Sequence, residues 1–116
     1  MTVELKPVQA LALWQNVVLE TVRREGPDLS SRQLAILLTV YLTPPPHTVR
    51  GLASSLKVSK PAITRALDTL GQLDLLKRKR DEADRRNVLV QRTVKGSMFL
   101  HDFGDLVSDA AGRLDA

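Results

Sequence analysis

Three consecutive prolines at positions 44–46 end any helix that reaches them, because proline lacks a backbone N–H and its ring clashes with the preceding helical turn. Gly26 and Pro27 mark an earlier break, which closes a first helical pattern over Glu4–Glu25. The segment between the two breaks has room for one further helix. It offers N-cap candidates and a core-facing set at helical spacing: Asp28, Ser30 and Ser31, followed by Leu34, Leu37, Leu38, Tyr41 and Leu42.

Two shorter helices are predicted after the prolines. Thr48 is an N-cap candidate for the first of them, and a turn at Lys57–Val58 leads to a second helix that starts near Ser59 and ends near Leu73. Proline disfavours helical geometry at the residue before it, so Pro61 leaves open whether this second helix begins at residue 60 or 61. Two short helices joined by a tight turn predict a helix-turn-helix.

The remaining sequence predicts a hairpin and a last helix. Leu75–Arg80 and Asn87–Arg92 have the length and composition of short strands, and the polar hexamer 81–86 joins them. Thr93 is the N-cap candidate of the last helix. The order of four helices, a hairpin and a helix predicts a mainly α fold with a small β-hairpin, in the α+β class. No long linker or internal repeat interrupts it, so residues 1–116 are expected to form a single domain.

The positive charge of the chain is concentrated in one stretch. Seventeen Lys and Arg against thirteen Asp and Glu give a net charge of +4. Residues 59–92 contain nine basic and five acidic residues, whereas residues 93–116 contain two and four. A basic block of this kind indicates a surface for a polyanion, although a solvated protein face has a similar composition.

Composition argues against several classes of protein. Without cysteine, there is no thiol nucleophile, thiolate metal site or disulfide. Aromatic residues make up only 3% of the chain, which argues against a base-stacking platform. Two histidines and no phosphate loop or nucleophile elbow predict a protein that is not an enzyme, with no cofactor and no metal. No stretch approaches the roughly 18 apolar residues of a membrane span, so a cytoplasmic protein is expected.

The helix that starts near Ser59 has two faces. Ile63, Ala66, Leu67 and Leu70 share an apolar face, and the opposite face is polar, as in a helix that reads base edges in a major groove or in an ordinary amphipathic helix. In the first case, the start of the helix contacts a phosphate or the bases. The candidate DNA-binding residues of this helix are Ser59 for a phosphate, Lys60, Thr64 and Arg65 for bases, and Pro61 beside them.

The hairpin carries a second group of cations. A protruding tip with arginine can enter a narrow minor groove while neighbouring cations contact phosphates, although a solvated edge strand is also rich in lysine. Asp84 stands two residues before Arg86 and can orient its guanidinium, or else simply form the turn. The candidate DNA-binding residues of the hairpin are Lys77, Arg78, Lys79, Arg80, Asp84, Arg85 and Arg86.

Taken together, these segments resemble the MarR family of winged helix-turn-helix regulators over nearly the whole chain. The wing signature of that family is Asp-x-Arg, five residues, Leu-Thr, two residues and Gly, and it is matched by Asp84, Arg86, Thr93 and Gly96. Residues 52–70 resemble the paired helices of the family. Two positions depart from the pattern, because Arg92 replaces the Leu and Asp74 replaces a Gly before the first wing strand.

The resemblance implies a winged helix-turn-helix transcriptional regulator that binds double-stranded DNA. It implies that Arg86 enters the minor groove, that Asp84 positions it, and that the helix from Ser59 reads the major groove. It further implies a homodimer formed by residues 1–27 and 93–116 around a DNA-binding core at 48–92, and a small-molecule effector near Trp14, Tyr41 and His47. The alternative is a winged-helix protein-interaction module that uses its basic wing on an acidic partner.

Overall fold

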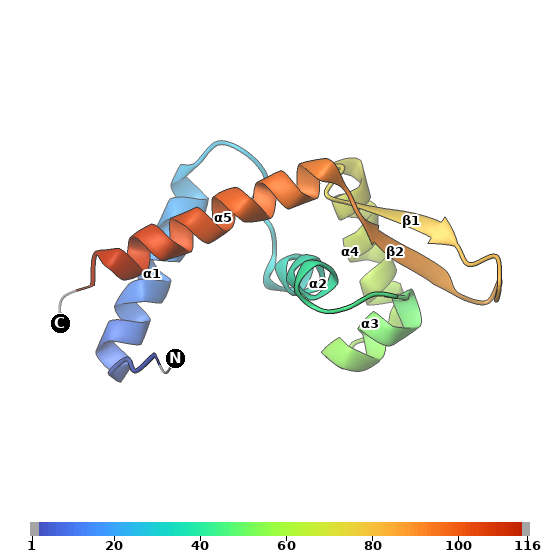
Figure 1. Cartoon of the computed structure of the whole chain (residues 1–116), viewed down its shortest axis with the longest axis horizontal. Helices are drawn as coiled ribbons and strands as arrows, with labels where there is room; N and C mark the ends of the chain where they lie inside the picture. The colour runs from blue at the N-terminus through green and yellow to red at the C-terminus, as the bar shows by residue number, and fades with distance from the viewer. Residues whose placement is uncertain (1–2, 115–116) are drawn as a thin grey trace. The chain divides into compact units, whose positions relative to one another are not determined.

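The computed structural model describes residues 3–114, which contain five helices and one two-stranded antiparallel sheet (Figure 1). The predicted order of four helices, a hairpin and a helix is confirmed, as is the mainly α fold. No helix in the described part of the chain is both long and apolar enough to cross a bilayer. The elements are α1 (Pro7–Arg23), α2 (Ser31–Leu42), α3 (Val49–Leu56), α4 (Lys60–Gln72), β1 (Leu76–Arg80), β2 (Val88–Arg92) and α5 (Val94–Gly112).

The chain divides into two compact units. One is made from Leu29–Leu100 and holds α2, α3, α4 and the hairpin. The other is made from the described residues of Met1–Asp28 and His101–Ala116. The terminal residues 1–2 and 115–116, which belong to the segments expected to form a dimer, lie outside the described residues.

Side-chain caps fix the starts of three helices at the places that the sequence predicts. The Ser30 hydroxyl accepts from the backbone N–H of Gln33 at 3.2 Å, and the Gln33 side chain accepts from the N–H of Ser30 at 2.9 Å. Thr48 and Ser59 each accept from the backbone N–H three residues on, at 2.9 and 3.3 Å. Of the two possible starts of α4, the structure has the earlier one, Lys60.

Several boundaries differ from the prediction. The first helix begins at Pro7 and not at Glu4, because the proline restricts Lys6 to extended backbone, where its N–H donates to the side chain of Gln9. Each strand begins one residue later than predicted, at Leu76 and Val88. Leu75 instead donates its N–H to the carbonyl of Leu70 at 2.9 Å and completes the end of α4.

Two non-glycine residues adopt left-handed backbone at helix ends. Lys57 follows α3 with a φ of 57°, and Asp74 follows α4 with a φ of 59°. After α3, the N–H of Val58 donates to the carbonyl of Ala53 at 3.1 Å. After α4, the N–H of Asp74 donates to the carbonyl of Gly71 at 3.0 Å. Each bond satisfies a carbonyl that the helix leaves unpaired. The geometry that a glycine would supply before the first wing strand is therefore supplied by an aspartate.

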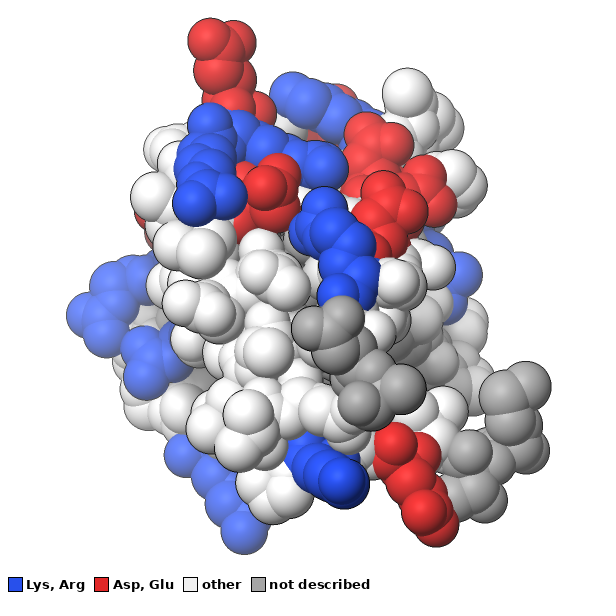
Figure 2. All heavy atoms as spheres, turned by 90° about the vertical axis from the view of Figure 1, so that its left-hand side faces the viewer, with Lys and Arg blue, Asp and Glu red and all other residues white. Residues whose placement is uncertain are grey.

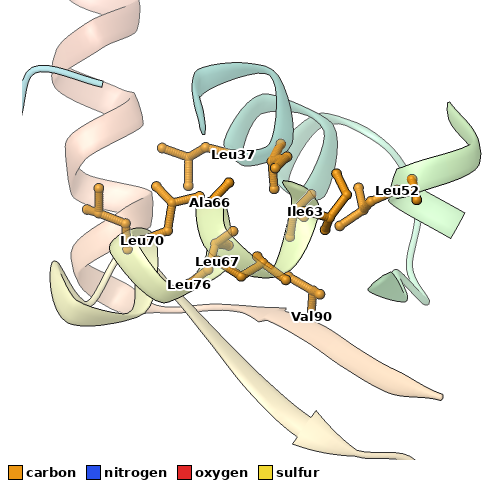
Figure 3. Packing of buried hydrophobic residues seen from close by; sticks show 12 residues of the cluster. Leu37, Leu52, Ile63, Ala66, Leu67, Leu70, Leu76 and Val90 are labelled. Carbon is orange, nitrogen blue, oxygen red and sulfur yellow. The ribbon is translucent and has the colours of Figure 1, made fainter. Parts of the chain in front are cut away.

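The core of the Leu29–Leu100 unit is built around α4 (Figure 3). The predicted apolar face of α4 is confirmed, since Ile63, Ala66, Leu67 and Leu70 are at most 5% exposed. Leu42 was expected in this core and is 77% exposed, because it lies about 200° around the helix from the buried Val40. The buried residues of the cluster are Ile36, Leu37, Val40, Leu52, Ala53, Ile63, Ala66, Leu67, Leu70, Leu75, Leu76 and Val90.

The second unit has a smaller core. Val17 of α1 is buried with Leu106 and Ala110 of α5, each at most 3% exposed. Leu13, Phe103 and Val107 pack against them while remaining partly exposed. Leu106 and Ala110 lie four positions apart in α5 and therefore share one face of the helix.

A tyrosine hydroxyl connects α2 to the two residues that flank the hairpin. The Tyr41 hydroxyl lies 3.0 Å from the carbonyls of both Leu75 and Thr93, and it accepts from the N–H of Thr93 at 2.9 Å. The Thr93 hydroxyl accepts from the N–H of Gly96 at 2.9 Å, which confirms the predicted cap of α5, and donates to the carbonyl of Asp74 at 2.7 Å. A Cβ at Gly96 would overlap the Tyr41 hydroxyl and the Leu75 carbonyl.

Two glycine-to-alanine changes in α5 are expected to have opposite effects on stability. Gly96→Ala places a methyl group against the Tyr41 hydroxyl and lowers the free energy of unfolding by about 1–3 kcal/mol. Gly104→Ala meets no atom within 4 Å and raises it by up to about 1 kcal/mol, the helix-propensity difference between the two residues. Urea unfolding followed by circular dichroism measures both. Equal midpoints for the two variants would contradict the proposed role of Gly96.

Candidate nucleic-acid interface

Cationic side chains from three elements surround a hollow of about 280 Å³, which we call the basic hollow. It lies between the start of α3, the first turns of α4 and the hairpin. Thr64, Asn87, Val49 and Val88 complete the lining. The four cations are Arg50 from α3, Lys60 from α4, Arg78 from β1 and Arg86 from the loop of the hairpin.

The predicted residues of α4 all lie at the surface, but they do not share one hollow. Ser59, Lys60, Pro61, Thr64 and Arg65 are exposed. Lys60 and Thr64 line the basic hollow, whereas Arg65 lines a second hollow of about 210 Å³ between the start of α2 and α4. The other residues of this second hollow are Ser30, Arg32, Gln33, Ala62, Ala66 and Thr69.

The pairing of the strands separates the cations of the hairpin. Arg78 stands opposite Val90 and on the same face as the buried Leu76, since side chains two residues apart in a strand share a face. Lys77 and Lys79 therefore lie on the other face of the hairpin. Arg80 and Arg85 are exposed, and neither lines the basic hollow. The structure thus brings two of the six predicted cations, Arg78 and Arg86, to the basic hollow.

Asp84 holds the Arg86 side chain through both carboxylate oxygens. The Nε and a terminal nitrogen of Arg86 donate to Oδ1 and Oδ2 at 3.0 and 3.1 Å, and the Arg86 backbone N–H donates to Oδ1 at 3.2 Å. The Arg86 side-chain bonds, followed by its backbone bond, hold the pKa of Asp84 below its usual value, and the charge of Arg50 adds to this effect. The Arg86 side chain is nevertheless 79% exposed, so an oriented guanidinium faces solvent.

Arg92 makes contacts of its own at the position where the wing signature has leucine. Its Nε donates to the carbonyl of Val40 at 3.1 Å. Its guanidinium carbon lies 5.6 Å from the centre of the Tyr41 ring, within the range of a cation–π interaction. The replacement therefore exchanges apolar packing at the base of the wing for a hydrogen bond and a ring contact.

Sequence reasoning missed two arginines that line these hollows. Arg50 belongs to the basic hollow and Arg32 to the hollow beside Arg65. Both lie outside residues 59–92, the stretch whose net positive charge predicts a surface for a polyanion. The signal that could have found them is position, because each is the second residue of its helix and follows a capped start.

An apolar hollow of about 280 Å³ lies on another side of the same unit. It is lined by Val40, Pro45, Pro46, His47 and the strand residues 89–92. Of the three residues expected near a small-molecule effector, His47 lines this hollow and Tyr41 has its hydroxyl engaged with backbone groups. The third, Trp14, is 58% exposed on α1.

One group of residues in the described chain has side chains close enough to share a metal ion. His101, Asp102 and Asp105 of α5 hold ligand atoms within 4.8 Å of one another. All three are exposed, with the His101 Nδ1 3.6 Å from an oxygen of Asp105. An exposed group of this kind is ordinary at a protein surface, so it identifies no metal centre.

Comparison with models of protein families matches the MarR family over residues 29–88. The YusO protein from Bacillus subtilis is similar in structure with a TM-score of 0.75 and 22% identity, over 91% of this chain and 74% of that one. The transcriptional regulator BldR from Sulfolobus solfataricus gives 0.63 and 29%, over 88% and 73%. MepR from S. aureus in a complex with DNA gives 0.69 and 17%, over 88% and 78%. Comparison with curated proteins gave no match.

The contact between Asp84 and Arg86 leads to a prediction for titration. We expect the Asp84 carboxyl to titrate below the 3.8 of an ordinary aspartate, and its pKa to rise in the Arg86→Gln variant because the main donor is lost. The stabilisation that Asp84 gains is present at neutral pH and is lost as the pH falls through its pKa. Carboxyl-carbon NMR measures the titration. Arg85→Gln is the control, and an Asp84 pKa that responds equally to both changes would refute the assigned pair.

Proposed function

This chain belongs to the MarR family, and from that premise we propose that it is a sequence-specific transcriptional regulator that binds double-stranded DNA. The α4 helix reads the major groove, and Arg86 of the wing enters a minor groove beside it. The observation that carries the proposal is the basic hollow, where α3, α4 and the wing bring four cations and the Thr64 hydroxyl together. The proposal includes a cytoplasmic location.

The geometry of α4 suits a groove reader. The B-DNA major groove is about 12 Å wide and admits one helix, whose first turns contact the bases. The first turns of α4 carry Lys60 and Thr64, which can bond to guanine and to either kind of base pair. The opposite face of these turns is held in the core by Ile63 and Leu67, both at most 1% exposed. A rigid support of this kind keeps the reading side chains in register with the base edges.

The wing supplies a donor for the minor groove. Arg86 donates to both carboxylate oxygens of Asp84, which limits its rotamers before DNA binds and lowers the entropy lost on binding. A narrow minor groove has an enhanced negative potential that attracts a guanidinium. Arg65 and Arg32 line the second hollow, between α2 and α4, where they can contact phosphates or bases.

We also propose that the protein acts as a homodimer through residues 1–27 and 93–116. Figure 2 shows a broad area of uncharged residues on the side of the molecule that faces left in Figure 1, with most charged side chains around it. An uncharged area is a candidate association surface where it includes several exposed apolar side chains. On α1, apolar residues three and four positions apart are 40–77% exposed: Val8, Leu11, Trp14, Val18 and Val22.

A two-fold dimer sets the spacing of the DNA site. Two copies of α4 related by a two-fold axis enter successive major grooves, so the half-sites lie about 10 base pairs apart.

A small-molecule effector is the remaining part of the proposal. Its support is the apolar hollow beside His47, whose volume of about 280 Å³ is close to the lower end of small-ligand pockets and whose lining includes Arg92.

Duplex binding across a salt series tests the function. The logarithm of the affinity should fall linearly with the logarithm of the salt concentration, with a slope of about −0.9 for each phosphate neutralised. Arg86→Ala should weaken binding to every duplex, whereas Arg65→Ala should cost about 1–3 kcal/mol and relax one base preference. Equal loss on all sequences for Arg65→Ala would assign this residue to a phosphate.

The control for these variants removes one positive charge elsewhere. Arg113 follows the last turn of α5, within a segment proposed for the dimer, so sedimentation first checks that Arg113→Ala keeps the dimeric mass; its duplex affinity should then stay within about twofold of the unmodified protein. If the unmodified protein binds no duplex at low salt, the DNA-binding proposal fails. Binding to an acidic protein in that case would favour a protein-interaction module.

The apolar face of α1 predicts how the dimer can be broken. Leu11→Glu puts a carboxylate on this face, where Leu11 is 70% exposed, and should yield a monomer at micromolar concentration because a buried charge opposes association. Leu42→Glu makes the same change at a leucine that is 77% exposed on α2, and should leave the dimer intact. Sedimentation gives the mass. A monomeric unmodified protein would refute the two-fold assembly.

A further inference from the structure

A second pair of aspartate and arginine joins the reading helix to the wing. A terminal nitrogen of Arg78 in β1 donates to Oδ1 of Asp68 in α4 at 2.6 Å, the shortest ion pair among the described residues. The two residues are ten positions apart in the chain, so the contact depends on the fold and not on a local turn. The Asp68 side chain is 55% exposed and that of Arg78 is 36% exposed, so both lie at the surface.

Asp68 is a negative charge on a surface that otherwise attracts anions. It stands one helical turn after Thr64, on the polar face of α4, and a lone carboxylate there would repel the phosphates of DNA. The contact with Arg78 cancels this charge. The same contact also limits what Arg78 contributes, because a neutralised guanidinium adds little to attraction that is independent of sequence.

The contact fixes the direction of the remaining donors of Arg78. A guanidinium has five N–H donors in one rigid plane, and the bond to Asp68 engages one terminal nitrogen. Arg78 also lines the basic hollow with Lys60, Thr64 and Arg86, so the plane is held beside the predicted base contacts. Arginine held in this way can donate two parallel bonds to the O6 and N7 of a guanine.

We propose that Asp68 is a positioning residue for Arg78, and that the pair makes Arg78 a specificity-determining contact to a base rather than a general contact to phosphates. This inference rests on the proposed DNA-binding function. It differs from the arrangement at the wing tip, where Asp84 and Arg86 are two residues apart and belong to the same loop. Asp68 instead links a strand of the wing to the reading helix.

The test compares two duplexes of equal length. One is a fragment that the unmodified protein selects from fragmented genomic DNA, and the other is its scrambled sequence. Asp68→Asn should lower the ratio of the two affinities about tenfold, because Arg78 loses its fixed direction. The same change frees one positive charge, so binding to the scrambled duplex should become tighter and its salt slope steeper by about 0.9.

Two further variants separate positioning from charge. Asp68→Glu keeps the carboxylate and should restore most of the ratio, whereas Arg78→Ala should lower the ratio without a steeper salt slope, since it removes a positive charge. Asp28→Asn is the matched control, because it removes an exposed aspartate between α1 and α2, outside the basic hollow and outside the segments proposed to form the dimer. It should leave the ratio unchanged. Thermal unfolding midpoints should agree among all variants, since the side chains concerned are exposed.

The outcomes distinguish the two proposals. If the unmodified protein binds neither duplex, or binds both equally, the proposed function itself fails. If it prefers the selected duplex and Asp68→Asn keeps that preference, the function stands and the positioning role of Asp68 is overturned. A ratio that falls equally in Asp68→Asn and Asp28→Asn would also overturn it, because long-range charge would then explain the effect.

Discussion

The Tyr41 hydroxyl is the contact on which the arrangement of the larger unit depends. It binds backbone groups of Leu75 and Thr93, the residues that stand just before β1 and just after β2. Because both ends of the hairpin are fixed to one atom of α2, the hairpin leaves the helical core in one direction. The glycine at position 96 follows from the same contact, since the space that its side chain would fill is taken by the hydroxyl.

Fixing the hairpin in this way converts a basic stretch of sequence into surfaces with separate roles. With its direction set, one face of β1 turns toward α4 and brings Arg78 to Asp68, while Lys77 and Lys79 occupy the other face. The net charge of +4 in residues 59–92 is therefore divided between the basic hollow and the remaining surface. Within the proposed function, the basic hollow lies at the reading contact, and the cations of the remaining surface add attraction that is independent of sequence.

Local signals in the sequence predicted the helices well. Contacts between residues that are far apart in the chain could not be predicted from such signals. Ser30, Thr48 and Ser59 each act within three residues of themselves, so their caps could be recognised from spacing alone. The place of Arg50 in the basic hollow and the bond between Asp68 and Arg78 both require the packed arrangement of α3, α4 and the hairpin. Arg50 carries only the weak signal of its place at a helix start, and nothing local links Asp68 to Arg78, because exposed polar residues are ordinary on helices and edge strands.

The acidic residues inside the basic stretch bear on how affinity and specificity are balanced. Asp68 and Asp84 each bond to an arginine that lines the basic hollow, so two of its four cations are charge-paired and two, Arg50 and Lys60, have no ion-pair partner among the described residues. Unpaired cations attract phosphates of any sequence, and that attraction weakens as salt rises. An arginine that is paired with a carboxylate has a guanidinium with a fixed direction, but it contributes less net positive charge. A surface that combines both kinds can hold DNA loosely at any sequence and tightly only where the bases match the fixed donors.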